Sequence, residues 1–466
     1  QPADIYMSEC LGTNAAYYGV LKVMEDMATV LGKKKDVKKY GQKAEALKKA
    51  INDNFWVEED GYYASYLYGR QNLTRTQQSE TLGESFCVLF GIADEERAAK
   101  VISSMPVGEF GPPIFSPQIV SQPDYHNNGV WPYVTSFWGK AAAKVGNETA
   151  LMHALACNVR TASIYATNYE NYSFNTGNPY TTQINSPNML WGLSGFMGLF
   201  HRTFFGLEFT KEGLALKPFV PTVLAGTRKL EAFPYRGMKL DITVSGSGNE
   251  IASCLVDGKE AEAFIPADWT GNHSIEIVMK GEHKPSSVNM VGYIGMPEVP
   301  AVKAEAGKLQ WNAISGAAKY WVLKDGQKVA ETTSCSYQTQ GDGEYQVIAV
   351  SDKGVRSFNS EPLRVYADAS VQSVAIDKWL DKTMGDQVKV KVNVPATGWY
   401  IVDWEYANGN GEVEQRNHCA NRLLYVDGKN AGPTVFPQRG LDDWKNYGWS
   451  NPVKVYLKKG SHQIAL

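Results

Sequence analysis

Residues 169–179 read Tyr-Glu-Asn-Tyr-Ser-Phe-Asn-Thr-Gly-Asn-Pro, and residues 185–195 read Asn-Ser-Pro-Asn-Met-Leu-Trp-Gly-Leu-Ser-Gly. The first segment has three Asn residues, one Gly and one Pro and predicts a loop, whereas the second leads into small and apolar residues that predict a helix over 188–204. From about residue 206 the apolar residues alternate, as in residues 239–244, which indicates strands. The stretch therefore marks the change from a helical part to a β-rich part.

Residues 1–205 carry apolar residues at helical spacing. One predicted helix has its apolar face at Val20, Val23, Met24, Met27 and Leu31 and ends at Gly32, and Asp94 is expected to cap a short helix. Further helices are predicted over 37–51, 79–91, 132–145, 148–164 and 188–204, which makes about seven in all. Long loops at 56–78, 105–131 and 165–187 join them, and loops of this length are usually functional.

Three all-β segments are predicted after residue 205, so that the fold class is multidomain. Residues 206–295 indicate an antiparallel β-sandwich. Residues 296–367 resemble a fibronectin type III module, with an early Trp311 and a later Tyr345 on predicted strands. Residues 368–466 are similar to the β-sandwich carbohydrate-binding modules of secreted glycosidases. The aromatic and amide candidates for sugar contact in this module are Trp444, Tyr447, Trp449 and Asn408, and core or loop packing is an equal alternative for each aromatic residue.

Composition excludes several classes of partner. The net charge of −3 gives no reason to expect nucleic acid or an anionic membrane, and no apolar run reaches transmembrane length. The six Cys residues are scattered without a CxxC pair, so we expect neither a zinc site nor a disulfide scaffold. We expect a monomer without a cofactor, and only a structural Ca²⁺ ion stays open.

Glu170 is a carboxylate within a loop of Tyr and Asn residues. Carbohydrate chemistry uses this combination, because aromatic rings stack on sugar rings, amides bond to hydroxyls and a carboxylate moves a proton. The chain has 12 Trp and 25 Tyr residues, many of them in polar surroundings, which favours carbohydrate contact for some of them.

A second motif, residues 124–132, reads Asp-Tyr-His-Asn-Asn-Gly-Val-Trp-Pro and precedes a predicted helix. With the loop around Glu170, it resembles the six-hairpin (α/α)-toroid glycosidases: trehalase, glucoamylase, mannosylglycerate hydrolase and the glucosidase part of glycogen-debranching enzyme. The residues that match are His126, Asn127, Gly129, Trp131, Pro132, Glu170, Thr176, Gly177 and Trp191, and Asn128 is an additional residue within the motif of residues 124–132. Residues 11–18 resemble the start of another helix of these enzymes.

The resemblance implies an inverting hydrolase of α-linked sugars in which Glu170 is the general base. Such a base activates a water, and a general acid must lie about 6.5–9.5 Å away. Glu9 and Asp4 are the acid candidates within the chain, and an acid upstream of residue 1 is the favoured one. The toroid needs more helices than the periodicity shows. We therefore expect residues 1–205 to be its C-terminal half, and the chain, which lacks an initiator Met, to be a mature form or a fragment that is incomplete on its own.

Substrate contacts are assigned from the same motifs and loops. The candidates are His126, Asn127, Trp131, Tyr125, Tyr172, Glu80 and Trp191. For Glu80 a helix cap is the stronger interpretation, since a first-turn carboxylate favours the helix dipole. Trp191 could equally serve helix packing alone.

A carbohydrate-binding protein without catalysis is the main alternative function, because half of the toroid is absent and the general acid is not assigned to one residue. A phosphorylase would lack the base. A lyase would need a Tyr or His base and a basic cleft, which the few Lys and Arg residues of the long loops do not supply. The appended modules imply a secreted, periplasmic or cell-surface bacterial protein whose signal peptide is not in this chain.

Overall fold

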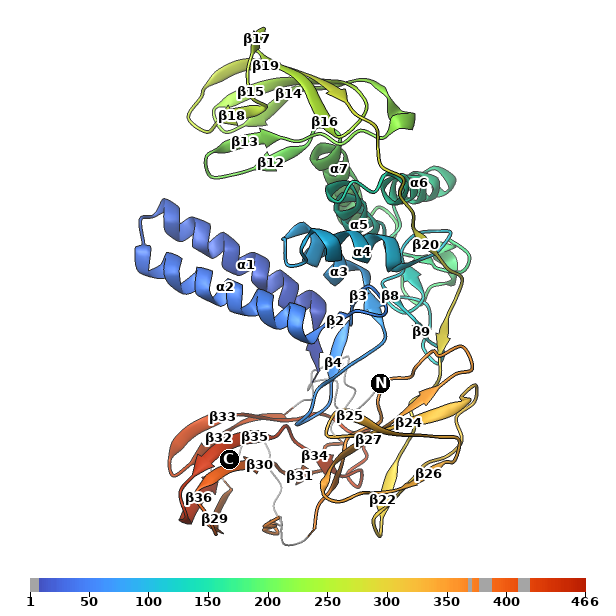
Figure 1. Ribbon diagram of the computed structural model, residues 1–466, viewed down its shortest axis with the longest axis vertical. Coiled ribbons are helices and arrows are strands. Elements are labelled where there is room, and N and C mark those ends of the chain that lie inside the picture. The colour runs from blue at the N-terminus through green and yellow to red at the C-terminus, as the bar shows by residue number, and fades with distance from the viewer. Residues whose placement is uncertain (1–7, 368–370, 377–387, 410–419) are drawn as a thin grey trace. The chain divides into compact units, whose positions relative to one another are not determined.

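The computed structural model describes residues 8–367, 371–376, 388–409 and 420–466 (Figure 1). The chain forms two compact units. The first consists of residues 10–66 and 75–296, and the second of residues 1–9, 67–74 and 297–466. The predicted acid candidate Asp4 and the thiol of Cys419 lie outside the described residues. The division into four domains stays a prediction, because the chain separates into two compact units.

Seven α-helices lie in the described part of the first unit, as the periodicity predicts. They are Leu11–Val30 (α1), Lys34–Asn54 (α2), Thr81–Leu89 (α3), Glu95–Ser104 (α4), Pro132–Lys144 (α5), Glu148–Tyr165 (α6) and Leu190–Thr203 (α7). Predicted end signals are confirmed at two of them. The Asp94 carboxylate accepts a hydrogen bond from the N–H of Arg97 at the start of α4, and Gly32 follows α1 with a φ of +67°.

The odd-numbered helices pack side by side and run in the same direction. α3 contacts α1 and α5, and α7 also contacts α5. The direction follows from the register, since Gly192 and Gly198 of α7 face Pro132 and Lys140 of α5 in the same order. The contacts between α1 and α3, and those between α3 and α5, show that these pairs of helices are parallel as well. The N-terminal ends of these four helices therefore lie together at one end of the layer.

The first and last helices of this row each leave an apolar face uncovered. The hairpin of α1 and α2 projects from the other helices (Figure 1). On α1 the predicted apolar face is exposed rather than buried, with Val23 at 58% and Met27 at 54%. The residues of α1 that are buried lie on its other face, at Leu11, Ala15, Tyr18 and Leu21. On α7 the side chains of Leu190, Leu193 and Met197 are exposed in the same way.

The long loops of the first unit contain pairs of very short strands. These are Trp56–Val57 (β2) with Tyr62–Tyr63 (β3), Ser79–Glu80 (β6) with Phe115–Ser116 (β8), and Gly129–Val130 (β10) with Tyr172–Ser173 (β11). The last pair joins the loop before α5 to the loop before α7. The strands Glu9–Cys10 (β1), Tyr66–Tyr68 (β4) and Thr74–Arg75 (β5) lie where the chain passes between the two units.

Two sheets form the β part of the first unit. The smaller sheet consists of Leu207–Phe209 (β12), Gly213–Leu216 (β13) and Phe264–Pro266 (β18). The larger sheet consists, in spatial order, of Gly226–Tyr235 (β14), Met238–Gly246 (β15), Gly271–Lys280 (β19), Glu250–Val256 (β16) and Lys259–Glu260 (β17). Alternate residues such as Leu240, Ile242 and Ile275 form one core. The prediction of a purely antiparallel sandwich is wrong in one respect, because β15 and β19 are parallel. Alternation is the same in both kinds of pairing, so the sequence pattern does not reveal the direction.

Residues 286–296 run back along the helical part and are attached to it at several points. Asn289–Met290 (β20) pairs with Pro106–Val107 (β7), and Gly295–Met296 (β21) pairs with Gln118–Ile119 (β9). The side chain of Asn147 donates to the carbonyl of Ser287, and Asn289 donates to Ser104. Residues 286–296 therefore belong to the first unit.

The second unit is all β in its described part. Residues 303–365 form one sheet of Lys303–Glu305 (β22), Lys308–Gln310 (β23) and Ser336–Gln338 (β26), and another of Gln327–Thr332 (β25), Lys319–Lys324 (β24), Gly343–Val350 (β27) and Leu363–Val365 (β28). Trp311 and Tyr345 lie in the core that these two sheets share.

The C-terminal segment has its own core, which includes Leu424, Val455 and Ile464. One sheet consists, in spatial order, of Lys389–Val394 (β29), Gly460–Ala465 (β36), Ala420–Val426 (β32) and Lys429–Phe436 (β33). Gly398–Val402 (β30) pairs with Val453–Leu457 (β35). Glu405–Tyr406 (β31) pairs with Gly448–Trp449 (β34).

The loop of residues 67–74 belongs to the second unit through buried charges. The Asp403 carboxylate lies 3.5 Å from a guanidinium nitrogen of Arg70 and 3.2 Å from one of Arg364. All three side chains are largely buried. The Arg364 guanidinium also lies 4.0 Å from the ring centroid of Trp449.

One local arrangement, which we call the Asp-Gly clip, occurs in all three β segments. Asp257, Asp325 and Asp427 each precede a Gly in a two-residue hairpin turn with positive φ, the geometry that favours Asp-Gly. Each Asp carboxylate accepts a hydrogen bond of 2.9 Å from a backbone N–H of a neighbouring strand, at Ser274, Glu344 and Gln463 respectively. In the first and last clips a His side chain also bonds to the Asp.

Candidate active site

Glu170 lies in the loop between α6 and α7, at the end of the layer where the parallel helices begin. Its side chain is half-buried, and its Oε2 lies 3.5 Å from the hydroxyl of Tyr125, which donates to it. The backbone N–H of Glu170 donates to the carbonyl of Ser186. Burial raises the pKa of Tyr125, and the neighbouring Glu170 carboxylate raises it further. The loop therefore holds the carboxylate beside a phenol that stays protonated.

A continuous group of aromatic rings extends from Tyr125 to α7. The His126 ring stacks on Trp131 with centroids 5.0 Å apart, and Tyr125 lies 5.2 Å from the same indole. Trp131 meets Trp191 edge-on at 5.4 Å, and Tyr133 lies 4.8 Å from Trp191. Pro132 begins α5 directly after Trp131, where its missing N–H is not needed. Two motifs that are far apart in sequence thus meet beside Glu170.

Polar side chains brace the two loops against each other. Asn127 is buried, and its amide donates to the carbonyls of Ile119 and Gln122 and accepts from the N–H of Ile119. The Asp124 carboxylate accepts from Asn128 and from the hydroxyl of Ser173, both at 2.8 Å. Because these bonds occupy the side chain of Asn127, it braces the loop in this structure.

Tyr172 and Trp131 are also largely buried. Tyr172 is 1% exposed, and its hydroxyl accepts the N–H of Tyr169. Its ring therefore offers no face for sugar stacking here, and it supports the loop that carries Glu170. His126 is exposed and Tyr125 and Trp191 are half-buried, so these three rings are the accessible ones among the predicted contacts.

Glu80 caps α3, as its sequence position favours. Its Oε2 accepts the N–H of Gly83 at 2.9 Å, and burial raises the pKa of Glu80 to about 7. Gly12 of α1 lies against this carboxylate, since a Cβ at Gly12 would be 2.8 Å from Oε2. One turn later, Glu84 is fully buried and accepts the N–H of Tyr63, and burial raises the pKa of Glu84 well above its usual range.

Glu9, the described acid candidate, is exposed on β1, immediately before α1. Its role and that of Asp4 stay predictions, as does the catalytic role of Glu170. Sequence reasoning missed two residues of the region, Asp124 and Tyr133. Their partners Ser173 and Trp191 are distant in sequence, and no local pattern indicates such contacts.

The candidates in the C-terminal module differ in their surroundings. Asn408 is buried and donates to the carbonyl of Phe436, and Trp449 lies under the Arg364 guanidinium. Trp444 and Tyr447 are exposed at 41% and 61%, so they are the accessible aromatic residues of this set.

The arrangement around Glu170 can bind a polyhydroxylated ring and move a proton. The exposed and half-buried rings supply stacking surfaces, and the carboxylate of Glu170 can accept a proton. Among the described residues, no group of three or more His, Cys, Asp or Glu side chains is placed to hold a metal ion.

Comparison with known families finds a match for the segment that contains Glu170. Residues 4–191 match the family model of the mannosylglycerate hydrolase MGH1-like glycoside hydrolase domain. The matched range contains both motifs and ends at Trp191. The match confirms, for this segment, the resemblance to glycosidases found in the sequence. No curated protein matches the chain.

Two solved structures are similar to parts of the chain. A cycloisomaltooligosaccharide glucanotransferase of Paenibacillus sp. is 32% identical over 18% of this chain and 11% of its own, with a TM-score of 0.15. A protein described as a sialidase is 16% identical over 55% of this chain and 26% of its own, with a TM-score of 0.45. This chain thus spans only a small part of either protein, and the low TM-scores carry no argument about fold. No helix in the described ranges is long and apolar enough to cross a membrane.

Proposed function

We propose that the chain carries part of an inverting glycoside hydrolase that acts on α-linked sugars, with Glu170 as the general base. The observation that carries the proposal is the contact of Glu170 with Tyr125, whose ring joins the group of His126, Trp131 and Trp191. The match of residues 4–191 to a glycoside hydrolase domain supports a glycosidase in general. Inversion and the α-linkage follow from the resemblance of the motifs.

The proposal includes a closed ring of helices of which α1–α7 are one part. The row of parallel helices ends at α1 and α7, and both helices expose apolar faces. Monomeric soluble proteins rarely leave large contiguous apolar patches uncovered. Further helices that pack against these two faces would complete an (α/α) toroid and could supply the general acid. The general acid is therefore proposed to lie either at Glu9 or outside residues 8–466.

The decisive experiment is the Glu170→Gln substitution in the full-length protein. Gln keeps the shape of the side chain but cannot accept the proton of the attacking water, so hydrolysis of α-glucosides and α-mannosides should fall by about 10²-fold or more. Glu109→Gln, an exposed glutamate of another loop, is the matched control and should leave turnover unchanged. Proton NMR of the released sugar should show the inverted anomer. Near-normal turnover by Glu170→Gln would exclude the assignment.

Trp444 and Tyr447 support a carbohydrate-binding role for the C-terminal module, because their exposed rings could stack on sugar. This role is independent of hydrolysis and would remain if catalysis were absent.

A further inference from the structure

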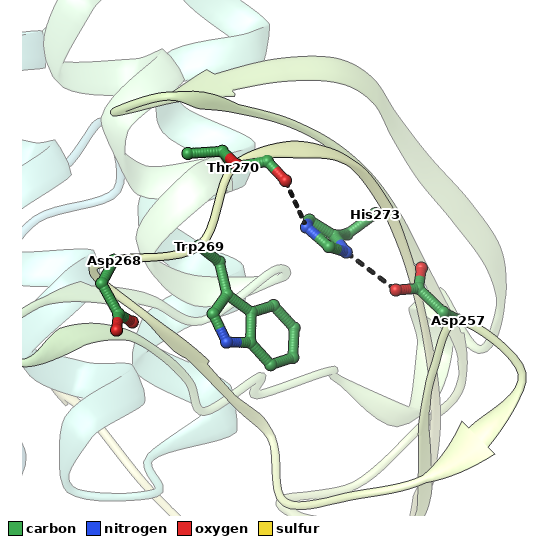
Figure 2. A pocket seen from close by; sticks show the side chains of 5 residues that line it. All are labelled: Asp257, Asp268, Trp269, Thr270 and His273. Carbon is green, nitrogen blue, oxygen red and sulfur yellow. Dashed lines mark hydrogen bonds and ion pairs between the residues drawn. The ribbon is translucent and has the colours of Figure 1, made fainter.

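A shallow hollow lies on the β part of the first unit, away from the motifs of the Glu170 loop. Its lining residues are Asp257, Asp268, Trp269, Thr270 and His273. Figure 2 shows the indole of Trp269 between the Asp268 carboxylate on one side and the His273–Asp257 pair on the other. Trp269 is 38% exposed, and its ring centroid lies 4.9 Å from that of His273.

Two of these residues, Asp257 and His273, belong to the Asp-Gly clip of this β segment. His273 Nδ1 bonds to Asp257 Oδ2 at 2.7 Å, and His273 Nε2 lies 3.2 Å from the carbonyl oxygen of Thr270. The clip of the C-terminal segment has the same pair of bonds, from His462 to Asp427 and to the carbonyl of Lys458. Its His has no tryptophan ring contact among the described residues, so a clip forms without one. Building the clip therefore does not explain why Trp269 is placed here with its ring exposed.

The chemistry of the hollow favours a neutral, hydroxyl-rich ligand. Asp268 has no hydrogen bond or ion pair in the described part of the chain, so both of its oxygens can accept bonds. Both ring nitrogens of His273 already have partners. The Asp268 carboxylate disfavours an anion by charge repulsion. An indole face beside carboxylate acceptors suits a sugar ring, whose C–H face stacks and whose hydroxyls donate.

We propose that this hollow binds a sugar residue of a neutral polysaccharide, with Trp269 as the stacking surface and Asp268 as a hydrogen-bond acceptor. The inference rests on the proposed function for the class of ligand, and adds a contact that is separate from the Glu170 loop. It would hold a polymeric substrate on the enzyme without taking part in the reaction.

Affinity electrophoresis of the Glu170→Gln protein tests the inference, because binding is then measured without hydrolysis. The probes are gels that contain yeast α-mannan, dextran or soluble starch, with polygalacturonate as an acidic comparison. At least one neutral probe should retard the parent protein. Trp269→Ala should weaken that binding about two- to tenfold, as the loss of one aromatic contact does. Asp268→Asn should weaken it less, since an amide still accepts one bond.

Phe209→Ala is the matched control, because Phe209 is an exposed aromatic residue of the same β part. It should be retarded like the parent, and Trp269→Phe should restore part of the binding lost in Trp269→Ala. The inference would be overturned if Trp269→Ala and the parent were retarded equally on every neutral probe. It would also be overturned if no neutral probe retarded the parent, or if only polygalacturonate were bound in a way that depends on Trp269. Each of these results leaves the hydrolysis test of Glu170 unaffected.

Discussion

The carboxyl group of Glu80 lies at the N-terminus of α3, against the backbone of Gly12 on α1. Two opposing effects act on it. Backbone N–H groups of the first turn favour the charged form, whereas burial favours the neutral form, and burial is the larger effect. The pKa of Glu80 is therefore raised from 4.5 to about 7. The helix cap is thus built from a group that changes its charge near neutral pH.

This shift gives a pH dependence of stability with a definite sign. Because the folded-state pKa is the higher one, the contribution of Glu80 is fully present below pH 4.5 and is lost as pH rises through about 7. The difference between the pKa values of 4.5 and about 7 corresponds to at most ~3 kcal/mol of unfolding free energy. Glu80→Gln keeps an acceptor for Gly83 but cannot ionise, so its unfolding free energy should fall less between about pH 5 and about pH 8.5 than that of the parent. Urea unfolding at the two pH values measures this.

Glu95→Gln is the control for this experiment, since Glu95 is an exposed first-turn glutamate of α4. It should follow the parent at both pH values. If Glu80→Gln shows the same pH dependence as the parent, the carboxylate is not buried in solution.

At the scale of the element, the Asp-Gly clip joins a hairpin turn to a neighbouring strand in each β segment. The first and last clips add an imidazole, whereas Gly343 occupies the corresponding place in the middle one. Hydrogen bonding to His462 lowers the pKa of Asp427, and the same bond raises the pKa of His462. The same local geometry therefore exists with and without an imidazole within one chain.

The comparison of Asp427→Asn with Asp325→Asn tests this difference. The Asp427–His462 pair is fully charged above the ordinary pKa of Asp, 3.8, and below that of His, 6.5, and its contribution is lost as pH rises through the raised pKa of His462. Asp427→Asn should therefore lower the melting temperature more at about pH 5.5 than at about pH 9. Asp325→Asn should lower it equally at both. Calorimetry, which can separate transitions of several domains, is the measurement, and equal losses in both variants would contradict the explanation.

Local patterns predicted the elements better than their partners. The seven helices, the cap at Asp94 and the strand at 239–244 follow from periodicity and end signals close in sequence. The parallel pairing of β15 with β19 depends on the path of the intervening chain, and the contact between Asp124 and Ser173 depends on the fold. The loop around Glu170 could be recognised because its residue types are specific, whereas Trp269 stands in no such pattern.

The apolar face of α1 shows a different limit of sequence reasoning. Its spacing correctly predicts a helix, but periodicity does not say which partner covers the face. In the described chain Val23 and Met27 are exposed, and Leu21 on the opposite side is buried.

At the scale of the whole molecule, the chain does not divide into units in sequence order. Residues 67–74 lie between α2 and α3 in sequence but belong to the unit of residues 297–466. Arg70 contributes a buried guanidinium beside Asp403, and the backbone N–H of Gln71 donates to Glu344. Burial raises the pKa of Asp403, and the two arginines oppose this shift.

Asp403→Asn should strongly destabilise the second unit. The substitution removes the charge that compensates Arg70 and Arg364, and breaking a buried ion pair in this way typically costs about 3–5 kcal/mol. Urea unfolding followed by fluorescence measures the loss. Asp443→Asn, at an exposed position of the same unit, should change the unfolding free energy by less than about 0.5 kcal/mol. A similarly small change for Asp403→Asn would show that the buried charges are not needed.

The attachment of residues 286–296 to the helical part decides where the gene can be shortened. A truncation after residue 205 or after residue 280 would leave the backbone of β7 and β9 without their parallel neighbours and Asn147 without Ser287. The shortest polypeptide that retains an intact Glu170 region therefore extends to Met296, even though the last strand of the preceding sheet ends at Lys280. Proteases should accordingly leave this segment uncut until the helices themselves open.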